Sequence, residues 1–230
     1  MIITIAHQKG GVGKSTIATN LAVTLKTDLF DLDKQFSSAE FNNTRMEAGL
    51  QGIACYTLLE GGCETPNQTP IKHADLVDFL LEYSGKPDKN IIIDCPGFDC
   101  DEVRASLYCA DYILTPVAAS QVEVYGLQNF EKIIEDTEEE YGKSIHSHVL
   151  INNADSRAKK RTEELKEFVA GEGMDHFILC KARLSRAMAF WDAYAEGMSV
   201  MEYKGGRRNA SAELRNLAWE ISNELGMEGE

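Results

Sequence analysis

The N-terminal segment constrains the fold most, because it places a glycine-rich loop directly between a predicted strand and a predicted helix. Ile2–Ala6 is a short apolar run of the kind that forms a buried strand. Apolar residues then recur at helical spacing through Leu21 and Leu25. The connecting loop, Lys9–Thr16, contains three glycines. A strand, a glycine loop and a helix in this order predict an α/β protein whose first loop can approach a ligand closely.

The loop from Lys9 to Thr16 has the residue types that bind phosphate. Its glycines allow backbone N–H groups to turn inward toward phosphate oxygens. We expect Lys14 to neutralise the β- and γ-phosphates of a nucleotide, and the hydroxyl of Ser15 to bind Mg²⁺. The usual pattern has a glycine where this chain has Gln8, so the match is to the form K-G-G-x-G-K-[ST]. The predicted nucleotide-binding residues of the loop are Gly10, Gly11, Val12, Gly13, Lys14, Ser15 and Thr16.

Lys9 is a second lysine on the same tight loop, although one lysine suffices for a nucleotide bound to one chain. One interpretation is that Lys9 reaches a nucleotide on a partner subunit and stabilises the charge that develops in phosphoryl transfer, as an arginine finger does. The alternative is a solvated surface lysine. The residues alone leave both interpretations open.

Two further segments end predicted strands with aspartates. Asp31 and Asp33 follow one strand, and Asp94 follows the apolar run that begins at Asn90. Because ligands of parallel sheets bind at the carboxyl ends of the strands, we expect these carboxylates beside the glycine loop. Asp94 is predicted to orient Mg²⁺, and Asp33 could orient an attacking water. For Asp31 and Asp33 the alternative is capping of the strand end. The turn Pro96–Gly97 could sense the γ-phosphate.

Short apolar runs alternate with longer amphipathic segments along the whole chain. This alternation predicts an α/β fold: one domain over residues 1–230, with a mostly parallel sheet flanked by helices on both faces. We expect Gly61–Pro70 and Lys204–Asn209 to be loops. The predicted strands are Ile2–Ala6, Asp28–Leu32, Asn90–Asp94, Tyr112–Pro116, His148–Ile151 and Phe177–Cys180. The predicted helices after the first are Ile71–Tyr83, Val122–Tyr141, Thr162–Ala170 and Ala210–Leu225.

The formal net charge is −14, which by itself argues against a general nucleic-acid binder. The charge is uneven, however, and acidic residues dominate from Glu131 to Glu140. Basic residues gather in two regions, and such a set is either a DNA-binding surface or an ordinary solvated face. These basic residues are Arg157, Lys159, Lys160, Arg161, Lys181, Arg183, Arg186, Lys204, Arg207, Arg208 and Arg215.

The chain shows no signal-peptide pattern at its N-terminus and no apolar run long enough to span a membrane. Six cysteines occur without a C-x-x-C pair, which favours free thiols in a reducing compartment over disulfides or zinc. We therefore expect a cytoplasmic protein. The apolar stretch Ala187–Tyr194 could line a binding site, but we interpret it as helix packing in the core.

Three motifs together resemble the ParA/MinD family of deviant-Walker P-loop ATPases, over nearly the whole chain. Lys9–Thr16 is similar to the family's deviant Walker A motif, Asp31–Gln35 to its D-x-D-x-Q segment, and Ile91–Gly97 to its Walker B motif. The C-terminal part from Arg183 to Ile221 is most similar to the ends of short plasmid-type ParA proteins.

The resemblance implies roles for individual residues. Lys9 corresponds to the signature lysine that crosses to the other subunit of an ATP-bound sandwich dimer, and Lys14 to the phosphate-loop lysine. Asp33 corresponds to the acid linked to hydrolysis. Asn152 matches a position near adenine, with Asn153 as the alternative, and either side chain could instead cap a turn.

The resemblance implies one of three classes of function. The first is a ParA-type partition ATPase: a homodimer with ATP and Mg²⁺ that binds non-specific DNA, is released by a ParB-like or other adaptor, and associates with the nucleoid. Its tentative DNA-binding residues are Arg183, Arg186, Arg207 and Arg208. The second is a MinD-like membrane-associated ATPase, which the acidic end Asn223–Glu230 disfavours because anionic lipid would repel it. The third is a metabolic enzyme on the same scaffold, for which no signature is present.

Overall fold

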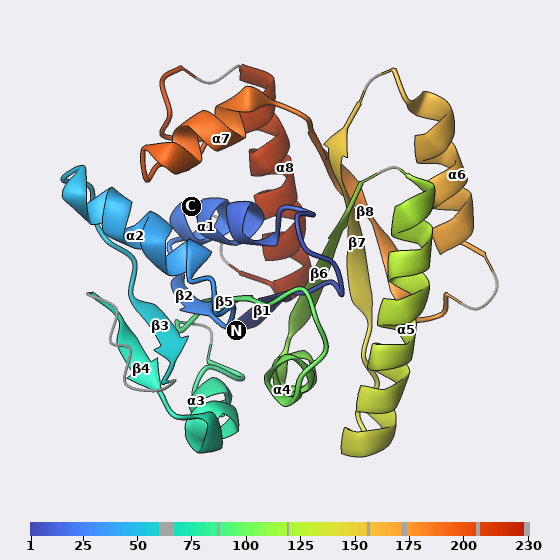
Figure 1. Ribbon diagram of the computed structural model, residues 1–230, viewed down its shortest axis with the longest axis horizontal. Helices are drawn as coiled ribbons and strands as arrows, with labels where there is room; N and C mark the ends of the chain where they lie inside the picture. The colour runs from blue at the N-terminus through green and yellow to red at the C-terminus, as the bar shows by residue number, and fades with distance from the viewer. Residues whose placement is uncertain are drawn as a thin grey trace.

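The computed structural model describes residues 1–59, 67–86, 88–118, 120–155, 157–171, 174–205 and 208–227. These residues contain an eight-stranded sheet with strand order β4-β3-β2-β5-β1-β6-β7-β8 (Figure 1). Every pair of neighbouring strands is parallel. The strands are β1 (Ile2–Ile5), β2 (Asp28–Asp31), β3 (Cys55–Leu58), β4 (Thr69–Ile71), β5 (Ile91–Asp94), β6 (Tyr112–Val117), β7 (Ser147–Ala154) and β8 (Phe177–Ser185).

Helices cover both faces of this sheet (Figure 1). The helices α3, α4, α5 and α6 pack in sequence on one face, and α1, α2, α7 and α8 pack on the other. The predicted α/β fold with a parallel sheet is therefore confirmed. The helices are α1 (Lys14–Leu25), α2 (Ser37–Glu47), η1 (His73–Asp75, a 3-10 turn), α3 (Leu76–Leu81), α4 (Asp101–Cys109), α5 (Gln121–Tyr141), α6 (Lys159–Val169), α7 (Met188–Ala195) and α8 (Arg208–Leu225).

The central strands are apolar on both sides because each side faces a separate hydrophobic core. In β5, Ile91 and Ile93 belong to the core under α3–α6, whereas Ile92 belongs to the core under α1, α2, α7 and α8. All three side chains are fully buried. Alternate residues of a strand point to opposite faces, so a strand covered on both sides reads as a continuous apolar run.

The strand register brings the polar ends of the central strands together. Ile5 of β1 pairs with Asp94 of β5, and Asp94 in turn pairs with Asp31 of β2. The loop after β1 and the two aspartates therefore leave the sheet at the same edge. This is the edge where ligands of parallel α/β sheets bind.

A buried arginine joins α2 to the turn after α7. The guanidinium of Arg45 donates to the carbonyl oxygens of Gln51 (2.7 Å) and Gly197 (3.0 Å) and forms two hydrogen bonds to the carboxylate of Glu202 (2.7 and 2.8 Å). Gly197 has a φ of 66°, and a Cβ atom there would lie 2.4 Å from the backbone nitrogen of Arg45. Only glycine fits this close approach.

Several sequence predictions were incomplete or wrong at the β4 side of the sheet. The predicted loop Gly61–Pro70 is wrong at its end, because Thr69–Ile71 forms the edge strand β4, while residues 60–66 lie outside the described part. The predicted helix Ile71–Tyr83 is shorter, since Ile71 pairs with Leu58 and the α-helix covers only Leu76–Leu81. The elements β3, α2 and α4 had not been predicted.

The second predicted loop, Lys204–Asn209, is also shorter than expected. Helix α8 begins at Arg208, so Arg208 and Asn209 are helical. Residues 206 and 207 lie outside the described part of the chain.

Candidate functional site

The glycine loop lies between the end of β1 and the start of α1, as predicted. Gly11 and Gly13 have φ values of 77° and 94°, a conformation that residues with a Cβ atom rarely adopt. Gly13 is the N-cap residue of α1. A Cβ atom on Gly10 or Gly11 would meet no described atom within 4 Å, so the loop has open space in front of it. Backbone N–H groups at a helix N-terminus beside such a space form a binding site for an anion.

Lys14 is the first residue of α1 and is nearly buried, with 7% of its surface exposed. Its Nζ donates a hydrogen bond of 2.9 Å to the carbonyl oxygen of Lys9. Burial lowers the pKa of Lys14, and the negative charge of Asp94 is the strongest of the effects that oppose it. A desolvated ammonium group held at the loop is suited to bind the phosphate oxygens of a nucleotide. Lys9 itself is partly buried on the same loop.

Asp94 offers a buried carboxylate oxygen to this site. Its Oδ2 accepts a hydrogen bond of 2.7 Å from the hydroxyl of Ser38. Its Oδ1 is buried and has no hydrogen-bond partner among the described residues. Burial raises the pKa of Asp94, and the hydroxyls of Ser38 and Ser15 and the ammonium of Lys14 oppose this rise. A buried carboxylate oxygen beside a hydroxyl group fits the oxygen ligands that Mg²⁺ prefers, so the predicted pair of Ser15 and Asp94 is chemically suitable for this ion.

Asp31 caps both the turn after β2 and the start of α2, whereas the alternative from the sequence was capping of the strand end alone. Its Oδ1 accepts from the N–H of Asp33 at 3.0 Å, and its Oδ2 accepts from the N–H groups of Ser38 and Ala39 at 2.9 and 3.0 Å. The N–H groups of Ser38 and Ala39 are among those at the start of α2 that lack a partner within the helix. Burial and the neighbouring charge of Asp94 raise the pKa of Asp31, while the backbone hydrogen bonds lower it.

Asp33 is partly exposed and lines the same cavity as the glycine loop. Its Oδ1 accepts a hydrogen bond of 3.0 Å from the N–H of Gln35, which holds the carboxylate in a turn. The position of Asp33 is compatible with the predicted role of orienting water, which stays a prediction.

The turn after β5 packs directly against the glycine loop. A Cβ atom on Gly97 would lie 2.8 Å from the nitrogen of Gly10 and 3.0 Å from the carbonyl carbon of Lys9. The two loops are thus in backbone contact at this point. A movement of the Pro96–Gly97 turn would move the phosphate loop with it.

Asn152 at the end of β7 contacts the glycine loop from the other side. Its Nδ2 donates a hydrogen bond of 2.7 Å to the carbonyl oxygen of Val12, and a Cβ atom on Gly13 would lie 2.5 Å from the same Nδ2. Asn153, with a φ of 52°, also lines the cavity. The described contact of Asn152 is therefore with the loop, and the predicted contact with adenine stays a prediction.

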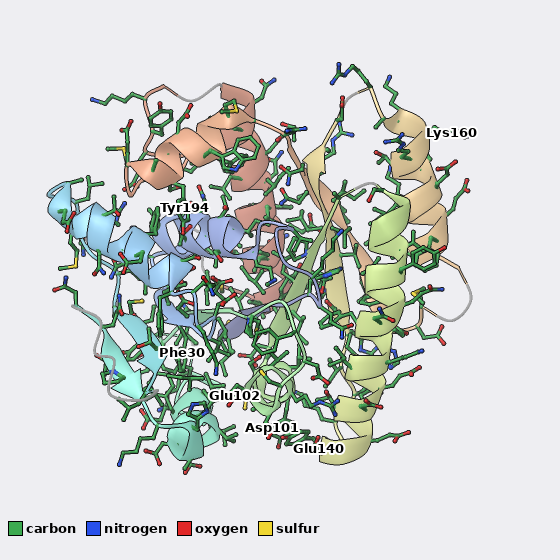
Figure 2. The ribbon with its side chains drawn as sticks, in the orientation of Figure 1. Phe30, Asp101, Glu102, Glu140, Lys160 and Tyr194 are labelled. Atoms are coloured by element: carbon green, nitrogen blue, oxygen red, sulfur yellow. The ribbon has the colours of Figure 1, made fainter. Side chains whose placement is uncertain are left out.

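The glycine loop opens into a cavity of about 500 Å³. This volume is within the range of small-molecule sites. One wall consists of aromatic side chains of α7, namely Phe190, Trp191 and Tyr194. Tyr194 points toward α2, and its hydroxyl donates a hydrogen bond of 2.5 Å to the carbonyl oxygen of Ser37 (Figure 2).

This wall corrects the interpretation of Ala187–Tyr194 as core packing. Phe190 and Ala193 are buried in the core, but Trp191 is 44% exposed and lines the cavity with Tyr194. Trp191 lies between the two core positions Phe190 and Ala193 on a short helix, so its place in the sequence does not distinguish it from a packing residue.

The predicted DNA-binding residues lie partly beside this cavity. Arg183 and Arg186 are exposed at the end of β8, next to Leu184 and Ala187, which line the cavity. Arg207 lies outside the described residues, and so does the side chain of Arg208, whose backbone starts α8. The structure therefore places two of the four arginines at the carboxyl end of β8, beside the cavity.

None of the helices in the described ranges combines the length and apolar composition that a transmembrane helix requires.

The fold and the loop geometry define a P-loop nucleotide-binding protein. The family model of the CobQ/CobB/MinD/ParA nucleotide binding domain matches residues 3–200. This chain therefore belongs to the ParA/MinD family, as the sequence motifs had indicated.

Two named relatives match 95% and 60% of the chain. The maintenance of carboxysome distribution protein A of Halothiobacillus neapolitanus is 22% identical over 226 residues, with 95% of each chain covered. The chromosome-partitioning ATPase Soj of Thermus thermophilus is 30% identical over 159 residues, or 60% of this chain and 61% of Soj.

Solved structures share the fold. A plasmid partition protein from Borrelia burgdorferi bound to AMPPNP superimposes with a TM-score of 0.66 at 20% identity, covering 97% of this chain and 99% of the other. The septum site-determining protein MinD of Pyrococcus horikoshii, complexed with Mg-ADP, gives a TM-score of 0.67 at 17% identity, covering 100% and 98%.

Proposed function

We propose that this chain is a ParA-like positioning ATPase that binds and hydrolyses ATP with Mg²⁺. The observation that supports it best is the combination of three features at the carboxyl ends of β1 and β5, where the glycine loop lines the cavity of about 500 Å³. These are an open glycine loop, a nearly buried Lys14, and a buried oxygen of Asp94 that has no hydrogen-bond partner in the described part of the chain. A phosphate group with a bound divalent cation would give each of them a partner: the anion for the glycine loop and Lys14, and the cation for the oxygen of Asp94.

In this proposal each residue has a defined task. The loop N–H groups and Lys14 hold the phosphates, and Ser15 and Asp94 hold Mg²⁺, which supplies charge neutralisation when bound. Asp33, on the cavity wall, orients the attacking water. The aromatic side chains of α7 line the same cavity, and in this proposal they contact the base of the nucleotide.

We further propose that ATP drives formation of a sandwich homodimer in which Lys9 reaches the nucleotide of the partner. The relatives include proteins named for carboxysome distribution and for chromosome partitioning, which favours a role in positioning a cargo. In the proposed cycle the dimer binds non-specific duplex DNA in the cytoplasm, and a ParB-like or other adaptor stimulates hydrolysis and release.

The first experiment compares Lys9→Ala with Lys14→Ala. We expect Lys14→Ala to lose nucleotide binding, because the phosphate charge is no longer neutralised at the loop. We expect Lys9→Ala to bind ATP but to lose ATP-dependent dimerisation, measured by light scattering, and hydrolysis, measured as phosphate release. Wild-type hydrolysis by Lys9→Ala would show that the cross-subunit role is wrong, while leaving nucleotide binding intact.

The second experiment tests DNA binding. ATP-bound protein should retard random-sequence duplex DNA at low salt, and the binding should weaken steeply as salt is added because counterions are released. Arg183→Glu combined with Arg186→Glu should abolish the retardation. Lys72→Glu combined with Lys132→Glu makes the same change in net charge at exposed positions of other elements and serves as the control. If both double variants lose DNA retardation equally, or if the wild type does not retard DNA, the proposed DNA surface at the end of β8 is contradicted.

A further inference from the structure

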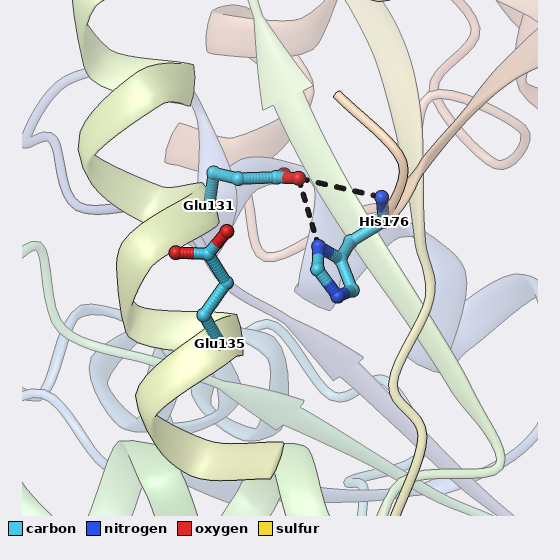
Figure 3. Close-up of side chains that lie close together, drawn as sticks. All are labelled: Glu131, Glu135 and His176. Atoms are coloured by element: carbon cyan, nitrogen blue, oxygen red, sulfur yellow. Dashed lines mark hydrogen bonds and ion pairs between the residues drawn. The ribbon is translucent and has the colours of Figure 1, made fainter. Parts of the chain in front are cut away.

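A cluster of glutamate and histidine side chains that can bind a metal ion lies between α5 and the segment that leads into β8 (Figure 3). Glu131 and Glu135 on α5 and His176 before β8 each offer one ligand atom, and these atoms lie within 4.8 Å of one another. The cluster is separate from the nucleotide cavity. His176 precedes the start of β8 at Phe177, whereas the cavity is lined by Leu184 near the end of that strand.

Glu131 is the buried member of the cluster, with 5% of its surface exposed. Its Oε1 accepts from the backbone N–H of His176 at 3.4 Å and lies 2.8 Å from the ring Nδ1 of the same residue. Its Oε2 is buried and has no hydrogen-bond partner among the described residues. A buried carboxylate oxygen without a donor is costly, and a cation beside it removes that cost.

The other ring nitrogen of His176 is held by a third carboxylate. Nε2 lies 3.2 Å from Oε2 of Glu138, whose Oε1 accepts from the backbone N–H of Ile145. When Nε2 carries the only ring hydrogen and donates it to Glu138, the lone pair of Nδ1 faces the carboxylate of Glu131, 2.8 Å away. In that tautomer a metal ion bound by Nδ1 and by a carboxylate oxygen supplies the positive charge that a second ring proton otherwise supplies.

The charge and the donor types favour a divalent ion in this position. Glu131, Glu135 and Glu138 lie four and three residues apart, which places them on one face of α5, opposite His176. Three carboxylates and one imidazole retain a net negative charge even when the ring is protonated. The ring of His146 lies 6.3 Å from that of His176 and adds a second imidazole at the surface.

We propose that Glu131, Glu135 and His176 form a binding site for a divalent transition-metal ion such as Zn²⁺, with Glu138 orienting His176. A histidine that binds a metal through one nitrogen commonly donates its other N–H to a carboxylate, as Nε2 does here. Mixed imidazole and carboxylate ligands suit Zn²⁺ and its neighbours better than Ca²⁺ or Mg²⁺. The ion would join α5 to the start of β8 and stabilise the chain without contacting nucleotide.

The test is a titration of the chelator-treated full chain with Zn²⁺ alone, by calorimetry and by thermal unfolding, without nucleotide. We expect one site per chain and a higher melting temperature with Zn²⁺. His176→Gln and Glu131→Gln should each lower the Zn²⁺ affinity at least tenfold, and Glu138→Gln should lower it by about 10–100-fold. His73→Gln is the matched control, because His73 lies outside the cluster and pairs at 2.6 Å with Glu102, so this variant should bind Zn²⁺ as the wild type does.

Since Glu131 is buried, its variant could fail to fold, so Glu135→Gln provides an exposed alternative that should also weaken binding. Circular dichroism and nucleotide binding check that each variant is folded. Absence of stoichiometric Zn²⁺ binding by the wild type would overturn the proposal. Undiminished binding by His176→Gln would also overturn it, because the metal would then be held by other groups, such as the cysteines.

Discussion

Gly97 allows the contact between the turn after β5 and the phosphate loop to be tested directly. A Cβ atom there would lie 2.8 Å from the nitrogen of Gly10, whereas ordinary contact begins at 3.4 Å. The atoms in the way belong to the backbone and cannot rotate aside. Gly97→Ala therefore forces the two loops apart, and overpacking of this kind costs about 1–3 kcal/mol. Alanine also restricts the unfolded chain, which offsets about 0.4–1 kcal/mol of this cost.

The assay is urea-induced unfolding without nucleotide, with Gly10→Ala as the matched control. A Cβ atom on Gly10 meets nothing within 4 Å, and its backbone is outside the left-handed region. Both variants gain the same benefit from the unfolded state, so the free energies of unfolding should differ by about 1–3 kcal/mol, with Gly97→Ala the less stable. Equal free energies of unfolding would refute the argument that the two loops are in rigid contact.

Two further predictions concern buried groups outside the loops. Burial, together with the charges of Lys14 and Lys9, lowers the pKa of His7 from 6.5 to about 3. Between pH 6.5 and 3 the imidazole of His7 is therefore protonated in the unfolded chain and neutral in the folded chain. The contribution of His7 to the free energy of unfolding is complete above pH 6.5 and is lost as the pH falls toward 3, at about 1.4 kcal/mol per pH unit. His7→Leu should remove that slope from urea unfolding measured between pH 6 and 4.5. Separately, Arg45→Met should lower the free energy of unfolding by about 3 kcal/mol, because the nearly buried guanidinium is lost and Glu202 keeps a half-buried charge.

Each of these two predictions has an outcome that contradicts it. If His7→Leu and the wild type lose stability equally as the pH falls, His7 is not kept neutral by the fold. For Arg45, the comparison is Arg45→Met combined with Glu202→Gln, which removes the uncompensated charge and should recover part of the stability. No recovery would mean that the ion pair with Glu202 contributes little to joining α2 and the turn after α7.

The sequence predicted those elements whose signal is local. The central strands are buried on both faces and form continuous apolar runs, so β1, β2, β5 and β6 were placed correctly. The edge strand β4 has three residues, includes Pro70, and is mostly exposed, so no apolar run indicated it. Helix α2 is mostly polar, and its buried members Asn42 and Arg45 form hydrogen bonds outside the helix. The position of α2 depends on contacts with distant parts of the chain, which the sequence of the helix alone does not indicate.

The same distinction applies to the site. The glycine loop and the strand-end aspartates were predictable because residue type and position after a strand determine where they lie. The hydrogen bond from Asn152 to Val12 joins residues 140 positions apart, and its existence depends on β7 lying next to β6. The aromatic wall of α7 was missed because Trp191 resembles a packing residue until the neighbouring cavity is known.

The sheet order has a consequence for the way the molecule is made. β1 comes first in the chain, yet its neighbours are β5 and β6, which end at Asp94 and Val117. Asn152, which holds the loop, comes later still, and Tyr194 of the cavity wall is last. A growing chain thus exposes its phosphate-binding residues long before it can bind phosphate. Under the proposed function, nucleotide therefore stabilises a chain that has already been synthesised through α7, and it does not stabilise the earlier segments on their own.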